Sequence, residues 1–210
     1  MLNIRTYPLG PLQTNCYVIS NKEKKCLIFD PGEQGEMFVK EIRNLRLKPL
    51  AIVLTHAHFD HIGAVEVVRE AFSIPVYIHQ AEKNWLMDAS KNGSARYTEL
   101  PLVEAKPADV LIEQDGLLEI GSFSCEMFHT PGHSPGSITY WFKEDGFAIV
   151  GDTLFQGSIG RTDLPHGNDK QLLQSINNKI LTLPDETVCY PGHGGPTTPQ
   201  EEKRHNPFLN

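Results

Sequence analysis

The stretch Thr55-His56-Ala57-His58-Phe59-Asp60-His61 places three imidazoles and one carboxylate within six positions, directly after the apolar run 50–54. Alternate side chains of a strand point to opposite faces, so a regular strand cannot aim all four groups at one small cation. We therefore expect a buried strand that ends at Thr55, a loop that presents the four groups, and a helix from about His61 to Phe72. This arrangement is typical of a metal-binding loop.

Three further candidate ligands stand beside other apolar, strand-like segments. His133 lies in a loop rich in glycine and proline at 130–137, Asp152 ends the apolar run 147–151, and His193 follows the run 187–190. Strands that pack as a sandwich bring such distant segments to one rim. We therefore expect these three side chains to meet the first four.

Seven candidate ligands are too many for one ion, because a catalytic zinc takes about three protein ligands and keeps one position open for water. We expect two divalent metal ions, zinc before iron or manganese, with the two carboxylate oxygens of Asp152 as the natural bridge. No motif contains a thiolate, so the site differs from the closed, cysteine-rich sites of structural zinc. The predicted ligands are His56, His58, Asp60, His61, His133, Asp152 and His193.

These motifs resemble those of the metallo-β-lactamase superfamily and, within it, of the glyoxalase II-like hydrolases. The resemblance rests on the His-x-His-x-Asp-His loop, on the glycine-flanked later ligands and on the opening segments 13–17 and 29–32, and it spans nearly the whole chain. It implies two ion sites that share Asp152 and a bridging water or hydroxide: one site with His56, His58 and His133, the other with Asp60, His61 and His193. The chain ends about where longer glyoxalase II enzymes begin a helical substrate domain, so we expect the short form.

The expected fold is α+β, a four-layer αββα sandwich with the metal site at one edge of the two sheets, in a single domain over residues 1–210. Helical spacing of apolar residues predicts one helix over 34–47 and another over 169–181. A third helix is expected through Trp85-Leu86-Met87. The first helix should turn inward Met37, Phe38, Ile42 and Leu45.

The metal pair suggests hydrolysis, because bound zinc lowers the pKa of water to about 7 and two ions can stabilise the attacking and the leaving atoms. This chemistry serves esters, amides, phosphoesters and thioesters alike. The resemblance to glyoxalase II implies a thioesterase of the hydroxyacylglutathione hydrolase type, with a metal-bound hydroxide as the nucleophile and a small acyl-thiol as the substrate. Asp60 then ligates or orients and need not act as a free base.

Arg161 is the candidate substrate contact, in the glycine-flanked loop 157–163. In glyoxalase II-like enzymes the corresponding loop presents a basic residue to the carboxylate of the conjugate, and the planar fork of an arginine suits a carboxylate. An ion pair between Arg161 and an aspartate of the same loop is an equal alternative.

Other functions stay open. A mononuclear-iron persulfide dioxygenase shares the His-x-His-x-Asp-His text and resembles this chain at Gly160-Arg161-Thr162-Asp163, and open histidine–carboxylate sites suit iron. A metal-dependent nuclease or phosphodiesterase is less favoured, because the net charge is −7. A catalytically idle binding domain is disfavoured by the complete ligand set. β-Lactam hydrolysis is disfavoured, because lactamases typically use a cysteine where this chain has Asp152.

Composition and segment lengths predict a cytoplasmic enzyme. The 210 residues with 40% hydrophobic content can bury one sizeable core. No stretch approaches the roughly 20 apolar residues that cross a bilayer, and residues 1–8 lack the apolar region of a secretion signal. We expect no membrane and no nucleic-acid partner; the oligomeric state stays open. The four cysteines form no Cys-x-x-Cys pair and are expected to be buried free thiols.

Overall fold

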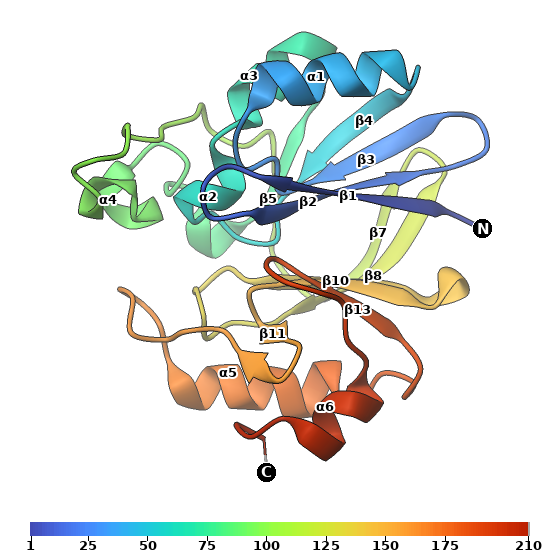
Figure 1. Cartoon of the computed structure of the whole chain (residues 1–210), viewed down its shortest axis with the longest axis vertical. Helices are drawn as coiled ribbons and strands as arrows, with labels where there is room; N and C mark the ends of the chain where they lie inside the picture. The colour runs from blue at the N-terminus through green and yellow to red at the C-terminus, as the bar shows by residue number, and fades with distance from the viewer. Residues whose placement is uncertain (210) are drawn as a thin grey trace. The chain divides into compact units, whose positions relative to one another are not determined.

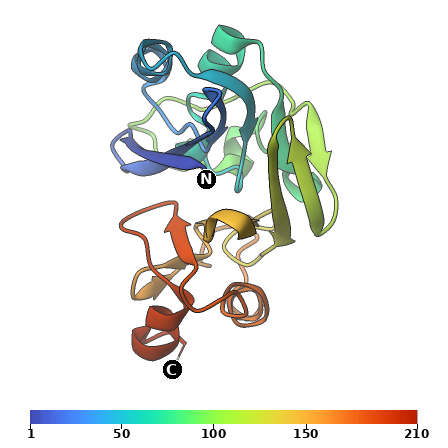
Figure 2. The same ribbon diagram turned by 90° about the vertical axis from the view of Figure 1, so that its right-hand side faces the viewer.

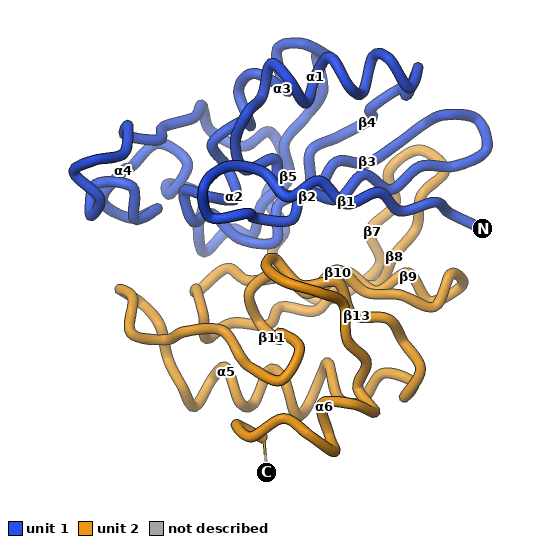
Figure 3. Tube along the Cα trace, in the orientation of Figure 1, with its two compact units in different colours: residues 1–112 blue, residues 113–210 orange. Residues whose placement is uncertain are grey.

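The computed structural model describes residues 1–209, and the chain divides into two compact units (Figure 3). Unit 1 comprises residues 1–112, and unit 2 begins at Glu113. Each unit is built around a sheet of its own that carries helices on one face (Figures 1 and 2). A single domain over residues 1–210 stays a prediction.

The sheet of unit 1 has six strands in the order β1-β2-β3-β4-β5-β6. The pairs β1–β2 and β2–β3 are antiparallel, and the pairs from β3 to β6 are parallel. Strands of parallel sheets are buried on both faces, so their sequences are continuous apolar runs. The apolar run 50–54, before the metal-binding loop, has this character and belongs largely to β4. The strands are β1 (Asn3–Leu9), β2 (Thr14–Ser20), β3 (Lys25–Phe29), β4 (Lys48–Val53), β5 (Val76–His79) and β6 (Val110–Ile112).

Two helices, α1 (Gly35–Asn44) and α3 (Val65–Phe72), cover one face of this sheet (Figure 1). The helix predicted over 34–47 is confirmed as α1, and its buried residues are Phe38, Val39 and Ile42. Met37 is 57% exposed, so its predicted inward position is wrong. Each helical residue is turned about 100° from the one before it, and Met37 lies just off the buried stripe.

The helix predicted from His61 to Phe72 is interrupted. The structure has a short helix α2 (Phe59–Ile62) and then α3, with Gly63 and Ala64 between them. A Cβ at residue 63 would collide with the carbonyl oxygen of Gly32, and the backbone N–H of Ala64 donates to the carbonyl of Pro31 at 2.9 Å. The connection from β3 to α1 therefore packs against the chain at this point and ends the first helix.

The helix predicted through Trp85-Leu86-Met87 is wrong. This region consists of turns between the 3₁₀ segment η1 (Gln80–Glu82) and the short helix α4 (Ala89–Asn92), which η2 (Ser94–Arg96) follows. The carbonyl of Leu86 accepts from the N–H of Ala105 at 2.7 Å, and is thus used by a distant segment and not by a helical turn. Trp85 and Leu86 are nevertheless buried in the core of unit 1.

Unit 2 holds a five-stranded sheet in the order β13-β10-β9-β8-β7 and a separate two-stranded hairpin, β11–β12. Only the β10–β13 pair of the larger sheet is parallel. The strands are β7 (Gly116–Ile120), β8 (Phe123–His129), β9 (Ile138–Phe142), β10 (Phe147–Gly151), β11 (Leu154–Phe155), β12 (Ser158–Ile159) and β13 (Val188–Pro191), with the 3₁₀ segment η3 (Lys143–Asp145) after β9.

Two helical segments cover the sheet of unit 2 (Figure 1). The helix predicted over 169–181 is confirmed: α5 (Asp169–Ser175) starts with the side chain of Asn168 accepting from the N–H of Gln171, and it continues as a π-helical turn, η4 (Ile176–Ile180). The helix α6 (Pro199–His205) begins with Thr198 as its N-cap and a proline in its first turn. Among the described residues, no helix combines the length and apolar character that a membrane crossing requires.

The four cysteines are buried free thiols, as predicted. Burial raises the pKa of Cys26, Cys125 and Cys189 to about 12, and that of Cys16 well above its usual range. At pH 8 a thiol with this pKa is about one ten-thousandth thiolate, and the thiolate is the reactive form. We expect negligible iodoacetamide labelling of the folded protein, followed by mass spectrometry, and four labels per chain in denaturant. Rapid labelling of any cysteine in the folded protein would contradict this packing.

Candidate metal centre

The metal-binding loop of unit 1 lies where β4 ends and α2 begins. His56 and His61 are fully buried, His58 is 7% exposed, and the side chain of Asp60 is 14% exposed. Four polar side chains in so buried a place require partners, because an unpaired polar group loses its hydration. The structure thus brings together the four ligands that the sequence predicts for this loop.

Asp30, at the end of β3, anchors this loop. Its carboxylate accepts from the backbone N–H of Thr55 at 2.8 Å, from the hydroxyl of Thr55 at 2.6 Å and from Nδ1 of His61 at 2.9 Å. A carboxylate only accepts, so Nδ1 of His61 carries the proton and its Nε2 keeps a lone pair. Asp30 therefore fixes the strand end and selects the metal-binding tautomer of His61.

The same reasoning sets the tautomer of His56. The only proton of the Thr55 hydroxyl is donated to Asp30, so this oxygen accepts from Nδ1 of His56, which lies 3.1 Å away. Nε2 of His56 then keeps its lone pair and lies 3.1 Å from Nδ1 of His58. Although an oxygen of Asp30 lies within 4.8 Å of the ligand atoms of His56 and His61, its hydrogen bonds make it an anchor and not a ligand.

Two short distances within unit 1 each join two of the four predicted ligands. His56 and His58 form one pair at 3.1 Å, and Nε2 of His61 lies 3.6 Å from Oδ2 of Asp60 in the other. Two ligand atoms that share a tetrahedral ion at about 2.0–2.1 Å lie about 3.3 Å apart. Both pairs fit that spacing. The same oxygen of Asp60 accepts from the hydroxyl of Thr14 at 2.8 Å, which orients the carboxylate.

Unit 2 brings together the other three predicted ligands, His133, Asp152 and His193. Nδ1 of His133 donates to the carbonyl of Arg161 at 2.8 Å, so its Nε2 keeps the lone pair. That Nε2 lies 3.6 Å from Oδ2 of Asp152, and Nε2 of His193 lies 3.6 Å from the same oxygen. One carboxylate is thus equidistant from two imidazoles, which is the arrangement expected of a ligand that two ions share.

Gly160 shows how tightly these ligands are placed. A Cβ at this position would collide with the carbonyl oxygen of Asp152 and would lie 3.1 Å from Cβ of His133. The chain after β12 can therefore pass between these two residues only without a side chain at 160. This close approach brings the carbonyl of Arg161 to His133.

Several supporting residues were not singled out from the sequence. Asp30 follows an apolar strand, as Asp152 does, and that position is the signal that could have found it. Glu82 is fully buried, and its Oε2 accepts from the N–H of Ala57 at 2.6 Å, between the two first histidines of the loop. Trp85 packs its ring 5.8 Å from that of His58. The roles of Glu82 and Trp85 depend on tertiary contacts that leave no spacing in the sequence.

Arg161 forms the ion pair that the sequence left as an alternative. Its Nε and a terminal nitrogen donate to the two carboxylate oxygens of Asp163, both at 2.7 Å. Both side chains are more than half exposed, so this bidentate pair is open to solvent. A substrate carboxylate would have to displace Asp163 or bind beside it.

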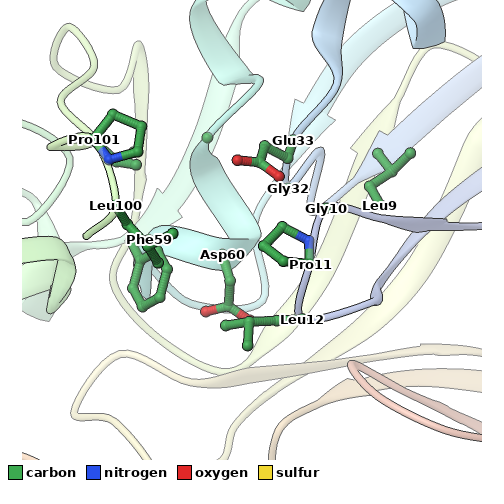
Figure 4. A pocket seen from close by; sticks show the side chains of 12 residues that line it. Leu9, Gly10, Pro11, Leu12, Gly32, Glu33, Phe59, Asp60, Leu100 and Pro101 are labelled. Carbon is green, nitrogen blue, oxygen red and sulfur yellow. The ribbon is translucent and has the colours of Figure 1, made fainter. Parts of the chain in front are cut away.

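A pocket in unit 1 lies beside Asp60 (Figure 4). Phe59 and Leu100 lie on one side of Asp60 and Pro11 lies on the other, and Leu12 also lines the pocket. Glu33 is the other carboxylate that lines it, and the pocket has no basic residue. It therefore suits an uncharged, apolar group.

The anchor role of Asp30 is testable with Asp30→Asn, because asparagine tolerates the positive φ of 48° at this position. The side-chain NH2 of the asparagine would then face a group that now donates to the carboxylate, and one hydrogen bond would be lost. We expect a loss of about 1–3 kcal/mol in the free energy of unfolding and a drop of about 10–100-fold in metal affinity. Urea unfolding and elemental analysis measure the two. Asp185→Asn, which breaks an exposed ion pair with Lys203, should leave both unchanged. Wild-type values for Asp30→Asn would refute the anchor.

The donor set fits a divalent ion. Imidazole nitrogens with carboxylate oxygens suit zinc, iron and related metals, whereas calcium and magnesium prefer oxygen alone. In His56, His61 and His133 the Nδ1 atom is held by a hydrogen bond, and this leaves Nε2 available to bind a metal.

Comparison with known proteins places the chain in a family. The family model described as the metallo-beta-lactamase superfamily matches residues 9–193. A probable metallo-hydrolase, YqgX, of Bacillus subtilis (strain 168) is 55% identical over 206 residues, which are 98% of this chain and 97% of that protein. The hydroxyacylglutathione hydrolase GloC of Haemophilus influenzae is 38% identical over 210 residues, 100% of this chain and 99% of GloC.

Solved structures agree. A crystal structure of BLEG-1 B3 metallo-beta-lactamase has a TM-score of 0.96 and 52% identity, and covers 99% of this chain and 100% of that one. TTHA1623 in a di-iron-bound form has a TM-score of 0.87 and 39% identity, over 98% and 100% of the two chains. ETHE1 from Myxococcus xanthus has a TM-score of 0.79 and 29% identity, over 98% and 83%. The predicted α+β fold is confirmed, and the chain belongs to the metallo-β-lactamase superfamily of metallo-hydrolases.

Proposed function

We propose that this chain is a dinuclear metal-dependent thioesterase of the hydroxyacylglutathione hydrolase type. The observation that carries the dinuclear part is the oxygen of Asp152, which lies 3.6 Å from an imidazole nitrogen of both His133 and His193. The relative named GloC, which matches this chain from end to end, supports the substrate class. We assign the ligands as the resemblance implies: one ion to His56, His58, His133 and Asp152, the other to Asp60, His61, His193 and Asp152.

Bound divalent ions would supply a water of lowered pKa and would polarise the carbonyl of the substrate. The residues of the chain would keep the ligand atoms in place before the substrate arrives. Asp30 holds the proton of His61 on Nδ1, and the carbonyl of Arg161 does the same for His133. Because the hydroxyl of Thr14 donates to Asp60, we assign Asp60 as an oriented ligand and not as a mobile base. Fixed ligands of this kind lower the reorganisation needed in the reaction.

The pocket beside Asp60 offers a place for the apolar part of a substrate. Leu12 and Phe59 provide apolar contacts, whereas the carboxylate of Glu33 would repel a negatively charged group. We therefore propose that an uncharged group of the thioester binds here, so that any carboxylate of the conjugate lies elsewhere. Small acyl-thiols fit this requirement.

Two alternatives have specific support. A mononuclear-iron persulfide dioxygenase remains a candidate because the chain resembles such enzymes at residues 160–163 and matches the ETHE1 structure. β-Lactam hydrolysis was disfavoured because Asp152 stands where lactamases often have a cysteine. The likeness to a protein named as a B3 metallo-β-lactamase weakens that argument. A nuclease or phosphodiesterase role has no comparable support here.

Metal content and turnover together test the proposal. We expect two ions per chain by elemental analysis, and hydrolysis of hydroxyacylglutathione thioesters by the metal-loaded protein. Asp152→Asn should lower turnover at least about a hundredfold, because a ligand of both ions is weakened. One tightly held iron, with oxygen uptake on a persulfide and no thioester hydrolysis, would falsify the proposal. Faster turnover of a chromogenic cephalosporin than of any thioester would favour the lactamase alternative.

Arg161 is the proposed contact for the substrate carboxylate, in competition with Asp163. Asp163→Asn should free the guanidinium and lower KM for acidic thioesters, whereas Arg161→Ala should raise it by a factor that corresponds to about 1.5–3 kcal/mol. KM for neutral thioesters should change little in both variants. If Arg161→Ala slows acidic and neutral substrates equally and lowers Tm, the ion pair braces the loop and does not bind substrate.

A further inference from the structure

A buried carboxylate on α6, in unit 2, is not one of the seven proposed ligands. Glu202 is 2% exposed, and its two oxygens accept from the backbone N–H of Gly157 at 3.0 and 3.2 Å. They also accept from the hydroxyl of Thr197 and from the side-chain amide of Asn206, the latter at 2.6 Å. We call Gly157, Thr197, Glu202 and Asn206 the Glu202 cluster.

Burial of this carboxylate is costly for a surface helix. A charged group that leaves water loses its hydration, and an apolar residue of similar size at such a position is often as stable or more stable. The carboxylate is compensated by donors from the hairpin turn at Gly157, from Thr197 before α6 and from Asn206, the C-cap of α6. The hydrogen bonds of Glu202 therefore join these segments in a defined geometry. A buried apolar residue would pack against them but would form no directional bonds.

One segment that the cluster holds is the hairpin β11–β12, which begins two residues after Asp152. Glu202 binds the turn of this hairpin at Gly157, and the amide of Asn206 donates to the carbonyl of Ser158 at 3.0 Å. α6 and β11 lie side by side in unit 2 (Figures 1 and 2). The chain that leaves Asp152 is thus held against α6.

The other segment is the loop that carries His193. Thr197 closes the base of this loop, because it exchanges two backbone hydrogen bonds with Cys189 of β13, at 2.8 and 3.0 Å. The hydroxyl of the same threonine binds Glu202. At the other end of the loop, the N–H of Gly192 donates to the carbonyl of Gly151, next to Asp152, at 2.9 Å. The cluster thus holds the His193 loop and the hairpin to one carboxylate.

The hairpin also leads to His133. After β12 the N–H of Gly160 donates to the carbonyl of Thr153 at 3.3 Å, and the carbonyl of Arg161 accepts from Nδ1 of His133 at 2.8 Å. On the same hairpin, the ring of Phe155 lies 6.2 Å from that of His193, edge to face. All three proposed ligands of unit 2 therefore connect to the segments that Glu202 joins.

We propose that Glu202 is a positioning residue that sets the spacing of His133, Asp152 and His193 by tying the β11–β12 hairpin to the His193 loop. This inference rests on the proposed metal centre. If the spacing depends on Glu202, its loss should weaken metal binding even though Glu202 is not itself a proposed ligand. A purely structural residue of α6 would lower the stability of the protein and leave the metal affinity unchanged.

The test compares Glu202→Gln with Glu201→Gln, the same chemical change at the neighbouring, exposed position of α6. Zinc affinity is measured by competition with a chromophoric chelator, and the cobalt-loaded protein is examined by visible absorption, which reports ligand geometry. We expect Glu202→Gln to lose about tenfold in zinc affinity and to shift the cobalt bands. Glu201→Gln should match the wild type. Thermal unfolding of the metal-free proteins measures the stability change separately.

Threonine variants keep the test decisive if Glu202→Gln does not fold. Thr197→Val removes only the hydroxyl that donates to Glu202, and it should lower zinc affinity as Glu202→Gln does. Thr197→Ser keeps this hydroxyl and should bind zinc as the wild type does. Lower Tm with unchanged zinc affinity and cobalt spectrum, in the variants that fold, would overturn the inference. A wild-type protein that binds no zinc or cobalt in the same titration would instead overturn the proposed metal centre.

Discussion

The hydrogen bonds of the Asp30 carboxylate are the constraint on which the candidate ligands of unit 1 depend. They join the end of β3 to the end of β4 through Thr55, and they reach α2 through His61. Because the carboxylate cannot donate, its partners must, and the protons of Thr55 and His61 are thereby fixed. The Nε2 atoms of His56 and His61 then carry lone pairs before any metal binds. A buried acceptor thus prepares a metal-binding face.

Unit 2 reaches the same end with a different acceptor. A backbone carbonyl, that of Arg161, fixes the proton of His133, and the close passage of the chain at Gly160 sets where that carbonyl lies. A carbonyl has no charge, so it costs less to bury than a carboxylate, but its position depends on the path of the loop. That dependence explains why the supports of unit 2 lie in the hairpin and in α6.

The sequence singled out the candidate ligands that the structure brings together within each unit, but not the residues that support them, for a physical reason. His56, Asp152 and His193 stand beside apolar runs, and strand periodicity makes such positions visible. Glu82 and Glu202 act through hydrogen bonds to segments 25 and 45 residues away, which no local pattern records. The helix boundaries failed for the same reason. Gly63 ends a helix because Gly32 lies against it, and Leu86 gives its carbonyl to Ala105.

The ligand set does not by itself select a reaction. Proteins similar to this chain are named as a hydroxyacylglutathione hydrolase, a B3 metallo-β-lactamase and ETHE1, so one fold carries several names. Hydroxide activation by a metal pair serves any acyl carbonyl that reaches it. Discrimination must come from groups that touch the substrate away from the ions. In the described residues the candidates are the apolar pocket with Leu12 and Phe59, and the exposed pair of Arg161 and Asp163. The two candidates differ in chemistry: the pocket of unit 1 is apolar and suits an uncharged group, whereas the guanidinium of unit 2 is cationic and already has Asp163 as a competitor.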